Sequence, residues 1–412
     1  MRIGEIAKRV NIPVNSVRYY INMGLLVPQN KNKQYIFNDD DLKDLELIIK
    51  LKSLHFSLND IHKILSLSRV SNLNDRGDIE DYLKFFLEQK DRLVQERTDL
   101  EKAISGIKNE IDHIKNSIEN HSLKTGVPLS MLSKIYCPHC QKQLNLKDAY
   151  IENQYVLSGE FLCDCGYTAK IKDGIICTKG GWISSYDYPD LDRSFMKNIP
   201  APFVSALQKS YNWMLEQLTN IPTDDMVLFE DHMNAYAFSY RHIAQMNPRT
   251  KYILADKYFE IVKMYKDRID RLNLNLDILY ICDATFELPL KQNCVDIFID
   301  YFSSNEYNFF NHHYLLDTLG PYFHSNTNIL GTYFYFKPGS RSMKQAILDY
   351  PETWDKNFDH PSFKKHFIGE ARYNSVDEEP MGYVTDSGSS DAFTFHLQGE
   401  EMHLHSYNWL KK

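Results

Sequence analysis

Apolar residues at the start of the chain recur with the spacing of short amphipathic helices. Positions 3, 6, 7 and 10 are apolar and define one face of a first predicted helix. Pro13 ends it, because proline cannot continue a helix interior. A second helix is predicted over VNSVRYYINMGLL, with Gly24 as its terminator. Two more amphipathic helices follow a polar, turn-prone stretch, and Asn38 is the candidate N-cap of the first. Two short helices joined by a tight turn can place the second helix in the DNA major groove.

A longer apolar pattern follows, in which the steps alternate between four and three residues. Its positions are Ile79, Leu83, Phe86, Lys90, Leu93, Arg97, Leu100, Ile104, Ile107, Ile111, Ile114 and Ile118. A heptad pattern kept over more than five repeats predicts a coiled coil, because the stripe of an ordinary globular helix drifts. The alternative is a long helix that packs on its own body. Gly126 and Pro128 mark the end of the pattern.

The second half of the chain alternates between strand and helix signals. After a linker over residues 184–202 and a helix over 204–218, strands are predicted at MVLF, KYILAD, LDILYICDA, VDIFIDYF and NILGTYFYFKP. Helices are predicted at SYRHIAQM and YFEIVKMYKDRIDRL. This alternation predicts an α/β layer with a mostly parallel sheet. Asp256 and Asp283 end the second and third strands, where ligands bind in open sheets, and would suit a ribose diol and an adenine amine.

Length and composition limit the class of protein. A chain of 412 residues predicts two to four domains, and 43% hydrophobic residues are enough for real cores. No apolar run approaches the roughly 20 residues needed to span a bilayer. The first residues lack the apolar region of a signal peptide, so we expect a cytoplasmic protein without membrane contact. Seven cysteines in a chain of this length favour metal ligands or buried thiols over a disulfide framework.

The charge is distributed unevenly. Residues 1–38 carry six lysines and arginines and one acid, a net charge of +5, so the remainder carries −13 of the total of −8. A small basic segment on an acidic body predicts that only the N-terminal segment meets nucleic acid.

Four of the cysteines form two closely spaced pairs. Cys137 and Cys140 stand in CPHC, and Cys163 and Cys165 stand in CDCG. Two thiolate pairs separated by 22 residues predict a tetrahedral zinc site, which would be structural because the protein fills all four positions. Cys177 lies near enough to be a spare ligand, although its apolar neighbours favour burial.

The first 70 or so residues resemble the DNA-binding domain of the MerR family of bacterial regulators. IGEIAKRVNIPVNSVRYYINMGLL, the wing stretch and the segment DDLKDLELIIKLKSLHFSLNDIHKIL carry this resemblance. The chain departs from the family at Ile21, where an acid is usual, and lacks the usual wing arginine. By this resemblance, six residues would contact double-stranded promoter DNA: Ser16, Arg18 and Tyr19 from the recognition helix, and Lys31, Lys33 and Tyr35 from the wing.

The same resemblance implies an assembly and a mechanism. The heptad helix would pair antiparallel with that of a second copy, giving a homodimer that reads a palindromic site. Such dimers twist and bend promoter DNA so that RNA polymerase engages it, and an effector sets the state.

The C-terminal half resembles class I methyltransferases, which use S-adenosylmethionine. SGEFLCDCGYTAKIKDGII resembles the small zinc ribbons that accompany some of these enzymes. CDATFELPLKQNCVDIFIDYFS resembles the stretch in which one aspartate ends the third strand and another, here Asp296, opens the fourth. DAFTFHLQGEEMHLHSYNW predicts a closing hairpin.

One stretch, VLFEDHMNAYAF, departs from the methyltransferase pattern. The family has an acid followed by small glycines there, because the backbone must adopt positive φ and approach the cofactor closely. Glu230 preserves the acid, but no glycine follows, and bulky side chains would fill the cofactor's volume. The stretch therefore argues against S-adenosylmethionine binding, and no catalytic residues are predicted. The hypothetical ligand-binding residues are Glu230, Asn234, Tyr236, Asp256 and Asp283.

The predicted fold class is thus multidomain, α and α/β. Its domains are a winged helix-turn-helix over residues 1–75, a coiled-coil helix over 76–125, a four-cysteine zinc ribbon over 130–182 and a Rossmann-like methyltransferase fold over 200–412. The predicted function is a dimeric transcriptional regulator whose non-catalytic methyltransferase-like domain senses a small molecule or a partner. Two alternatives stay open: an active S-adenosylmethionine-dependent methyltransferase fused to a DNA-binding head, and a purely structural body.

Overall fold

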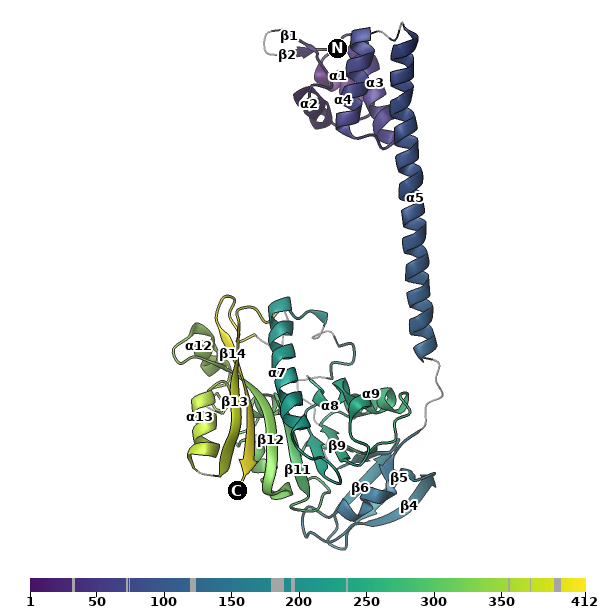
Figure 1. The fold of residues 1–412 in the computed structure, drawn as a ribbon. Helices are drawn as coiled ribbons and strands as arrows, with labels where there is room; N and C mark the ends of the chain where they lie inside the picture. Colours follow the sequence, from purple (N-terminus) through teal and green to yellow (C-terminus); the bar gives the residue numbers. More distant parts are fainter. Residues whose placement is uncertain are drawn as a thin grey trace. The chain divides into compact units, whose positions relative to one another are not determined.

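The chain forms two compact units, Met1–Glu119 and Asn120–Lys412. A computed structural model describes residues 1–31, 34–71, 73, 75–118, 124–178, 189–193, 197–234, 236–354, 356–370, 372–388 and 394–412 (Figure 1). Among these residues, no helix combines the length and the apolar character needed to cross a membrane.

The N-terminal unit is helical, with a small two-stranded sheet. Its elements are α1 (Ile3–Arg9), α2 (Val14–Asn22), β1 (Gln29–Lys31), β2 (Gln34–Ile36), α3 (Asp39–Ser53), α4 (Leu58–Ser71) and α5 (Arg76–Ile118). The predicted order of helices and wing is confirmed. The apolar faces of α1 to α4 close a core around fully buried residues such as Ile6, Val17 and Leu45.

Local sequence signals fix the helix ends of this unit. At the start of α3, Asn38 Oδ1 accepts a hydrogen bond from the Asp41 N–H, and Asp41 Oδ2 accepts one from the Asn38 N–H, both at 2.8 Å. This reciprocal capping box satisfies two backbone donors that a helix start leaves free. At the end of α2, Gly24 has a φ of +71°, and the Leu25 N–H returns to the Tyr20 carbonyl at 2.9 Å. A residue in this left-handed conformation ends the helix, as the sequence predicted.

Helix α5 runs for 43 residues and extends far beyond the four shorter helices of its own unit (Figure 1). Its first part packs on that unit, because the Phe86 ring lies 5.2 Å from the Phe56 ring. Phe86, a predicted seam residue, therefore belongs partly to the core of the same chain. The later seam residues are exposed in the single chain: Leu100, Ile104, Ile107, Ile111 and Ile114.

The C-terminal unit is built on one mixed sheet with helices on both faces. Its strands are β3 (Val127–Pro128), β4 (Asn145–Glu152), β5 (Tyr155–Leu162), β6 (Thr168–Lys172), β7 (Ile175–Cys177), β8 (Val227–Glu230), β9 (Lys251–Asp256), β10 (Asp277–Cys282), β11 (Val295–Tyr301), β12 (Phe323–Phe336), β13 (Tyr373–Val384) and β14 (Met402–Lys411). Its α-helices are α7 (Ala201–Thr219), α8 (Phe238–Arg241), α9 (Phe259–Asp270), α10 (Ser303–Asn308), α11 (Leu315–Thr318), α12 (Arg341–Asp349) and α13 (His360–Lys364).

The sheet has the mostly parallel centre that the strand and helix alternation predicted. Its strand order is β13-β14-β12-β11-β8-β9-β10-β7-β6-β5-β3, with β4 paired to β5. Strands β12, β11, β8, β9 and β10 are mutually parallel, and β14 runs antiparallel between β12 and β13. An antiparallel pair, β13 and β14, closes this edge, but only β14 falls in the stretch predicted as a hairpin, because β13 ends at Val384, before that stretch begins. The stretch predicted as one helix at SYRHIAQM instead forms α8 and a 3-10 turn over Ile243–Gln245.

Side chains of the central strands alternate between two cores. In β8, Leu228 belongs to the cluster under α7 and α9, whereas Val227 and Phe229 belong to the cluster on the other face. This two-residue period is what a strand buried on both faces requires. The sheet therefore holds the carboxyl ends of β8, β9 and β10 at fixed neighbouring positions.

The cysteine-bearing segment is joined to this sheet. Strand β7 pairs in parallel with β10, and Cys177 is the register partner of Cys282. Met131, Ile135 and Phe161 of the same segment contribute to the second core. The predicted ribbon and the methyltransferase-like fold therefore share one sheet and one compact unit.

Candidate functional site

The exposed face of α2 presents polar and aromatic side chains. Arg18 and Tyr19 are exposed, and Ser16 is partly buried. Asn15 and Asn22 are exposed on the same face as Arg18 and Tyr19, because positions 15, 18, 19 and 22 follow helical spacing. The two asparagines were not predicted, although this spacing could have found them. The face offers a cation, a phenol and two amides, which suit phosphates and base edges.

The wing provides further exposed groups. In the β1–β2 pair, Asn30 faces Tyr35 and Lys31 faces Gln34. Lys31 and Tyr35 are exposed, while the predicted Lys33 lies outside the described residues. The side chains of Lys31 and Tyr35 are thus available to a phosphate backbone.

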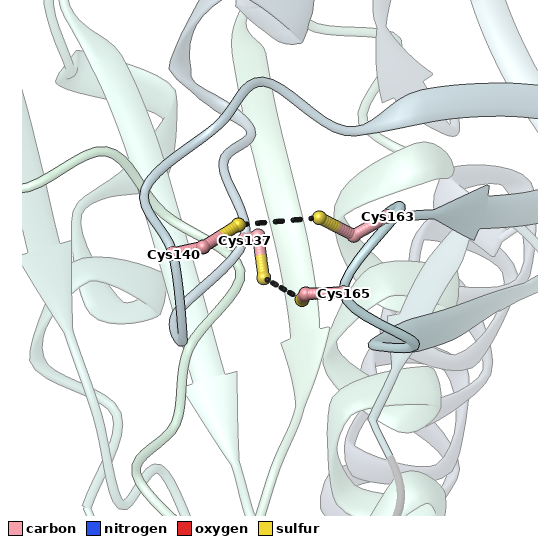
Figure 2. A group of neighbouring side chains, drawn as sticks. All are labelled: Cys137, Cys140, Cys163 and Cys165. Atoms are coloured by element: carbon pink, nitrogen blue, oxygen red, sulfur yellow. Dashed lines mark hydrogen bonds between the residues drawn. The ribbon is translucent and has the colours of Figure 1, made fainter.

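The four paired cysteines converge in space, as Figure 2 shows. Cys137 Sγ lies 3.4 Å from Cys165 Sγ, and Cys140 Sγ lies 3.3 Å from Cys163 Sγ. All four sulfur atoms lie within 4.8 Å of one another. A tetrahedral zinc site with Zn–S bonds of about 2.3 Å separates its sulfurs by about 3.8 Å, so the donor set and its spacing fit a metal. Cys177 lies outside this cluster.

The first cysteine knuckle docks on the loop that follows β10. The Tyr136 N–H donates to the Pro289 carbonyl at 3.2 Å, and the Lys291 N–H donates to the Lys134 carbonyl at 2.8 Å. His139 Nε2 lies 3.0 Å from Glu287 Oε2. The knuckle therefore holds residues 287–291 in place, next to the predicted ligand residue Asp283.

Glu230 ends β8 and is used inside the protein. Its two carboxylate oxygens accept hydrogen bonds from the Phe238 N–H at 2.5 Å and the Ser239 N–H at 2.8 Å, so it holds the start of α8. The residue is buried. Burial raises its pKa to about 7, and the hydrogen bonds from Ser239 and Phe238 oppose the rise.

Asp256 ends β9 and is also enclosed. Oδ2 accepts from the Asn234 N–H at 2.8 Å, and Oδ1 accepts from the Tyr258 N–H at 2.9 Å. The residue has 0% exposure. Burial first, and the nearby Glu306 carboxylate second, raise its pKa to about 7. Both oxygens thus already have backbone partners.

Asp283 follows β10 in a similar way. Its carboxylate accepts from the Thr285 N–H at 2.9 Å, from the Phe286 N–H at 2.5 Å and from the Thr178 hydroxyl. Burial raises its pKa, and these hydrogen bonds oppose the rise. Glu230, Asp256 and Asp283 are therefore brought to neighbouring strand ends, where each binds local backbone.

Aromatic side chains fill the space between these strand ends. Tyr236 packs against Phe302 and Tyr301 with ring centroids at 4.9 and 5.6 Å. His232 stacks on Phe286 at 5.6 Å. His232 has a φ of +60°, a conformation that glycine adopts most easily. The loop thus keeps a left-handed residue after β8 and places an imidazole there.

The linker before α7 also contacts this loop. The Asp190 N–H donates to Asn234 Oδ1 at 3.0 Å, and the Arg193 guanidinium donates to the Asn234 carbonyl at 2.7 Å. Asn234 therefore acts as a junction between the linker and Asp256 rather than projecting into open space.

Two ion pairs at this edge, one partly buried and one buried, were missed from the sequence. Lys257 Nζ lies 3.2 Å from Glu306 Oε1, and His232 Nδ1 lies 3.5 Å from Asp231 Oδ2. Burial lowers the pKa of His232, but Asp231 and Glu306 raise it above its usual value overall. Lys257 and Glu306 are far apart in sequence, so no local spacing could have revealed their pairing.

Comparisons with known proteins give different relatives for the two units. The family model described as "MerR HTH family regulatory protein" matches residues 1–68. The HTH-type transcriptional regulator YfmP of Bacillus subtilis is 25% identical over 138 residues, which cover 29% of this chain and 98% of that protein. A solved MerR-family regulator from Bacillus thuringiensis is 29% identical and covers 27% of this chain and 97% of its own, with a TM-score of 0.22.

Solved structures similar to a larger part of the chain include a putative methyltransferase. A solved putative sarcosine dimethylglycine methyltransferase from Galdieria sulphuraria is 12% identical and covers 50% of this chain and 86% of its own, with a TM-score of 0.36. At such TM-scores the likenesses carry no weight for function. The match over residues 1–68, together with the helix order and the wing, identifies the N-terminal segment as a MerR-family helix-turn-helix domain. The C-terminal unit has a mixed sheet and a cysteine cluster that could hold a metal.

Proposed function

We propose that this protein is a dimeric transcriptional regulator that binds promoter DNA through its N-terminal unit. The observation that carries this proposal is the exposed face of α2, with Arg18 and Tyr19, on a domain that matches the MerR family. Arg18 and Tyr19 enter the major groove, and the wing residues Lys31 and Tyr35 contact phosphates. The dimer distorts the promoter so that RNA polymerase engages it.

The dimer forms through α5. Leu100, Ile104, Ile107, Ile111 and Ile114 keep heptad spacing and are all more than 40% exposed in the single chain. A seam of this length buries its apolar side chains when it meets a second copy. Two heads held by one coiled coil then bind two half-sites at a fixed spacing.

The C-terminal unit senses a small molecule or a partner without transferring a methyl group. This part of the proposal is supported by Glu230 and Asp256, whose carboxylate oxygens accept hydrogen bonds from the unit's own backbone. It is also supported by Tyr236 and His232, which occupy the region after β8 where the methyltransferase family has glycines. A ligand that moves the 231–238 loop would change the contacts of this whole edge.

The metal in the cysteine cluster is zinc with a structural role. Four protein thiolates leave no open position for a substrate, and the knuckle they form braces the loop at residues 287–291. Zinc lost from this cluster would release that loop.

An active S-adenosylmethionine-dependent methyltransferase is the second candidate. It is favoured by one observation: Asp256 and Asp283 lie side by side at adjacent strand ends, where the Asp283 N–H donates to the Asp256 carbonyl at 3.1 Å. In this alternative the 231–238 loop opens to admit the cofactor, and Asp256 exchanges its bond to the Asn234 N–H for the ribose.

The proposal is tested on the purified full-length protein in two assays. Selection from a random double-stranded DNA pool should enrich an inverted repeat, which a monomeric or non-specific binder would not do. A thermal-shift screen with S-adenosylmethionine, S-adenosylhomocysteine and aromatic metabolites should find a stabilising compound. If no inverted repeat is enriched, the regulator proposal is wrong. If no compound in the screen is stabilising, the C-terminal unit is a structural scaffold and not a sensor.

A further inference from the structure

Two cysteines outside the metal cluster lie directly opposite each other at the sheet edge. Cys177 in β7 is the register partner of Cys282 in the parallel strand β10. Both side chains pack against the core cluster under α7 and α9, so they point to the same face of the sheet. Adjacent strands lie about 4.8 Å apart, which falls within the Cα–Cα range of about 4.4–6.8 Å that a disulfide spans.

The two thiols have different environments. The Cys177 thiol donates to the Ile175 carbonyl and the Cys282 thiol to the Lys257 carbonyl, each at 3.7 Å. The neighbouring Cys282 thiol, aided by Lys172, lowers the pKa of Cys177 despite burial. The pKa of Cys282 is raised by the neighbouring Cys177 thiol and by burial. Both side chains are partly exposed. A dithiol with one thiol that ionises readily and a resolving thiol beside it is the arrangement that redox-active pairs use.

We propose that Cys177 and Cys282 form a redox-active dithiol, which a hydroperoxide oxidises to a disulfide. The Cys177 thiolate attacks one peroxide oxygen, the O–O bond breaks, and the leaving hydroxide or alkoxide takes up a proton to become water or an alcohol. The Cys282 sulfur then attacks the resulting sulfenic acid, an S–S bond forms, and the S–OH bond breaks. The departing hydroxide takes the Cys282 proton as water. Two thiols lose two electrons in total, and the hydroperoxide gains them.

The disulfide would act on the edge where the predicted ligand residues lie. Thr178, which follows Cys177, donates its N–H to the Cys282 carbonyl at 3.1 Å and its hydroxyl to the Asp283 carboxylate. A disulfide between Cys177 and Cys282 would restrain these contacts. It would also restrain the loop that runs on to Phe286, whose ring stacks on His232. Oxidation therefore restrains the loops after β8 and β10, and a thiol reductant releases them.

The remaining cysteines provide internal controls. Cys294 is buried and immediately precedes β11, and the other four thiols face one another in the metal cluster. Trypsin separates the proposed partners cleanly: Cys177 falls in the peptide of residues 173–179 and Cys282 in that of residues 272–291, and each peptide has one cysteine. A cross-link between them is therefore unambiguous.

The test is peptide mapping of the full-length protein after treatment with hydrogen peroxide and alkylation of free thiols. We expect a linked species lighter by two hydrogens than the sum of the two peptides, parallel loss of alkylation at Cys177 and Cys282, and recovery of both with dithiothreitol. Cys294→Ser should keep the link, and Cys177→Ser and Cys282→Ser should each abolish it. Hydrogen exchange at residues 283–286 should slow on oxidation and recover on reduction.

Two results would overturn the proposal. One is peroxide treatment that oxidises Cys177 or Cys282 to sulfinic acid, or joins either to another cysteine, without joining the two. The other is an unmodified pair under peroxide that oxidises other thiols of the same chain. The map of the unsubstituted protein decides between these results and the expected one, even if a serine variant fails to fold.

Discussion

The backbone N–H of Asn234 donates a hydrogen bond of 2.8 Å to the carboxylate of Asp256. The acid that ends β9 therefore holds the loop that follows β8, with a second bond from the Tyr258 N–H on its other oxygen. A carboxylate at this strand end could bind a ribose diol if its oxygens faced a cavity. Here the residue is fully buried, so a ligand must displace the loop before it reaches Asp256.

Glu230 makes the stability of the C-terminal unit depend on pH. Its pKa rises from 4.5 to about 7 on folding, so between these values the folded state holds a proton that the unfolded state has lost. The contribution of Glu230 to the free energy of unfolding is therefore fully present below pH 4.5. It is lost as the pH rises through about 7, and the loss is at most about 3 kcal/mol.

Glu230→Gln should remove this contribution and flatten the pH dependence of unfolding. Asp256, whose pKa is also raised to about 7, keeps part of the slope. Urea unfolding followed by tryptophan fluorescence at several pH values measures this slope for the C-terminal unit, because all four tryptophans lie in residues 120–412. Substitution of the exposed Glu216 by glutamine is the matched control and should leave the slope unchanged. An equal slope in both variants would show that Glu230 is ionised in the folded protein.

The cysteine cluster should hold one zinc ion per chain. Cys140→Ser removes one of four ligands and should lower the zinc content measured by plasma mass spectrometry by tenfold or more, as well as the melting temperature of the C-terminal unit. Cys294→Ser, which removes a buried thiol outside the cluster, should leave the zinc content unchanged. Full zinc retention in the Cys140 variant would mean that the four thiols are not a metal site.

Arg18→Ala should weaken specific DNA binding by roughly 1–3 kcal/mol, about 5-fold to 150-fold, since Arg18 projects from the exposed face of α2. Fluorescence anisotropy with the selected DNA site measures the affinity, and sedimentation confirms that the variant stays dimeric. The control is Arg271→Ala, which removes an exposed arginine from the other unit. An affinity within twofold of the unsubstituted protein would exclude Arg18 from the DNA contact.

Ile107→Glu should break the dimer, because it places a charge in the apolar seam of α5. Lys108→Glu introduces the same side chain one residue later, off the seam, and should leave the dimer intact. Sedimentation velocity distinguishes the two. A dimer of equal strength in both variants would mean that α5 does not pair along this seam.

The sequence predicted the elements whose signals are local. The heptad steps of α5, the N-cap at Asn38 and the strand ends at Asp256 and Asp283 were all visible as spacing or residue type. The sequence did not show that the Asp256 carboxylate is already hydrogen-bonded, because its partners are the backbone N–H groups of Asn234 and Tyr258, which carry no sequence signal. The pairing of Lys257 with Glu306, and of β7 with β10, likewise joins residues far apart in the chain.

His232 stands in the region after β8 where the methyltransferase family has glycines. Its φ of +60° shows that the backbone still turns as a glycine loop would, while its imidazole stacks on Phe286. The sequence could predict that a bulky residue stands here, but not that it would adopt the left-handed conformation and fill the space.

Titration calorimetry of the full-length protein with S-adenosylmethionine tests whether the C-terminal unit binds this cofactor. We expect no saturable heat in the micromolar range, because residues 231–234 and 236–238 follow β8 at the carboxyl edge of the sheet and Asp256 accepts a hydrogen bond from the Asn234 N–H. Saturable micromolar binding that disappears in Asp256→Ala, with tryptophan fluorescence showing that variant to be folded, would contradict it and establish the C-terminal unit as a cofactor-binding methyltransferase domain.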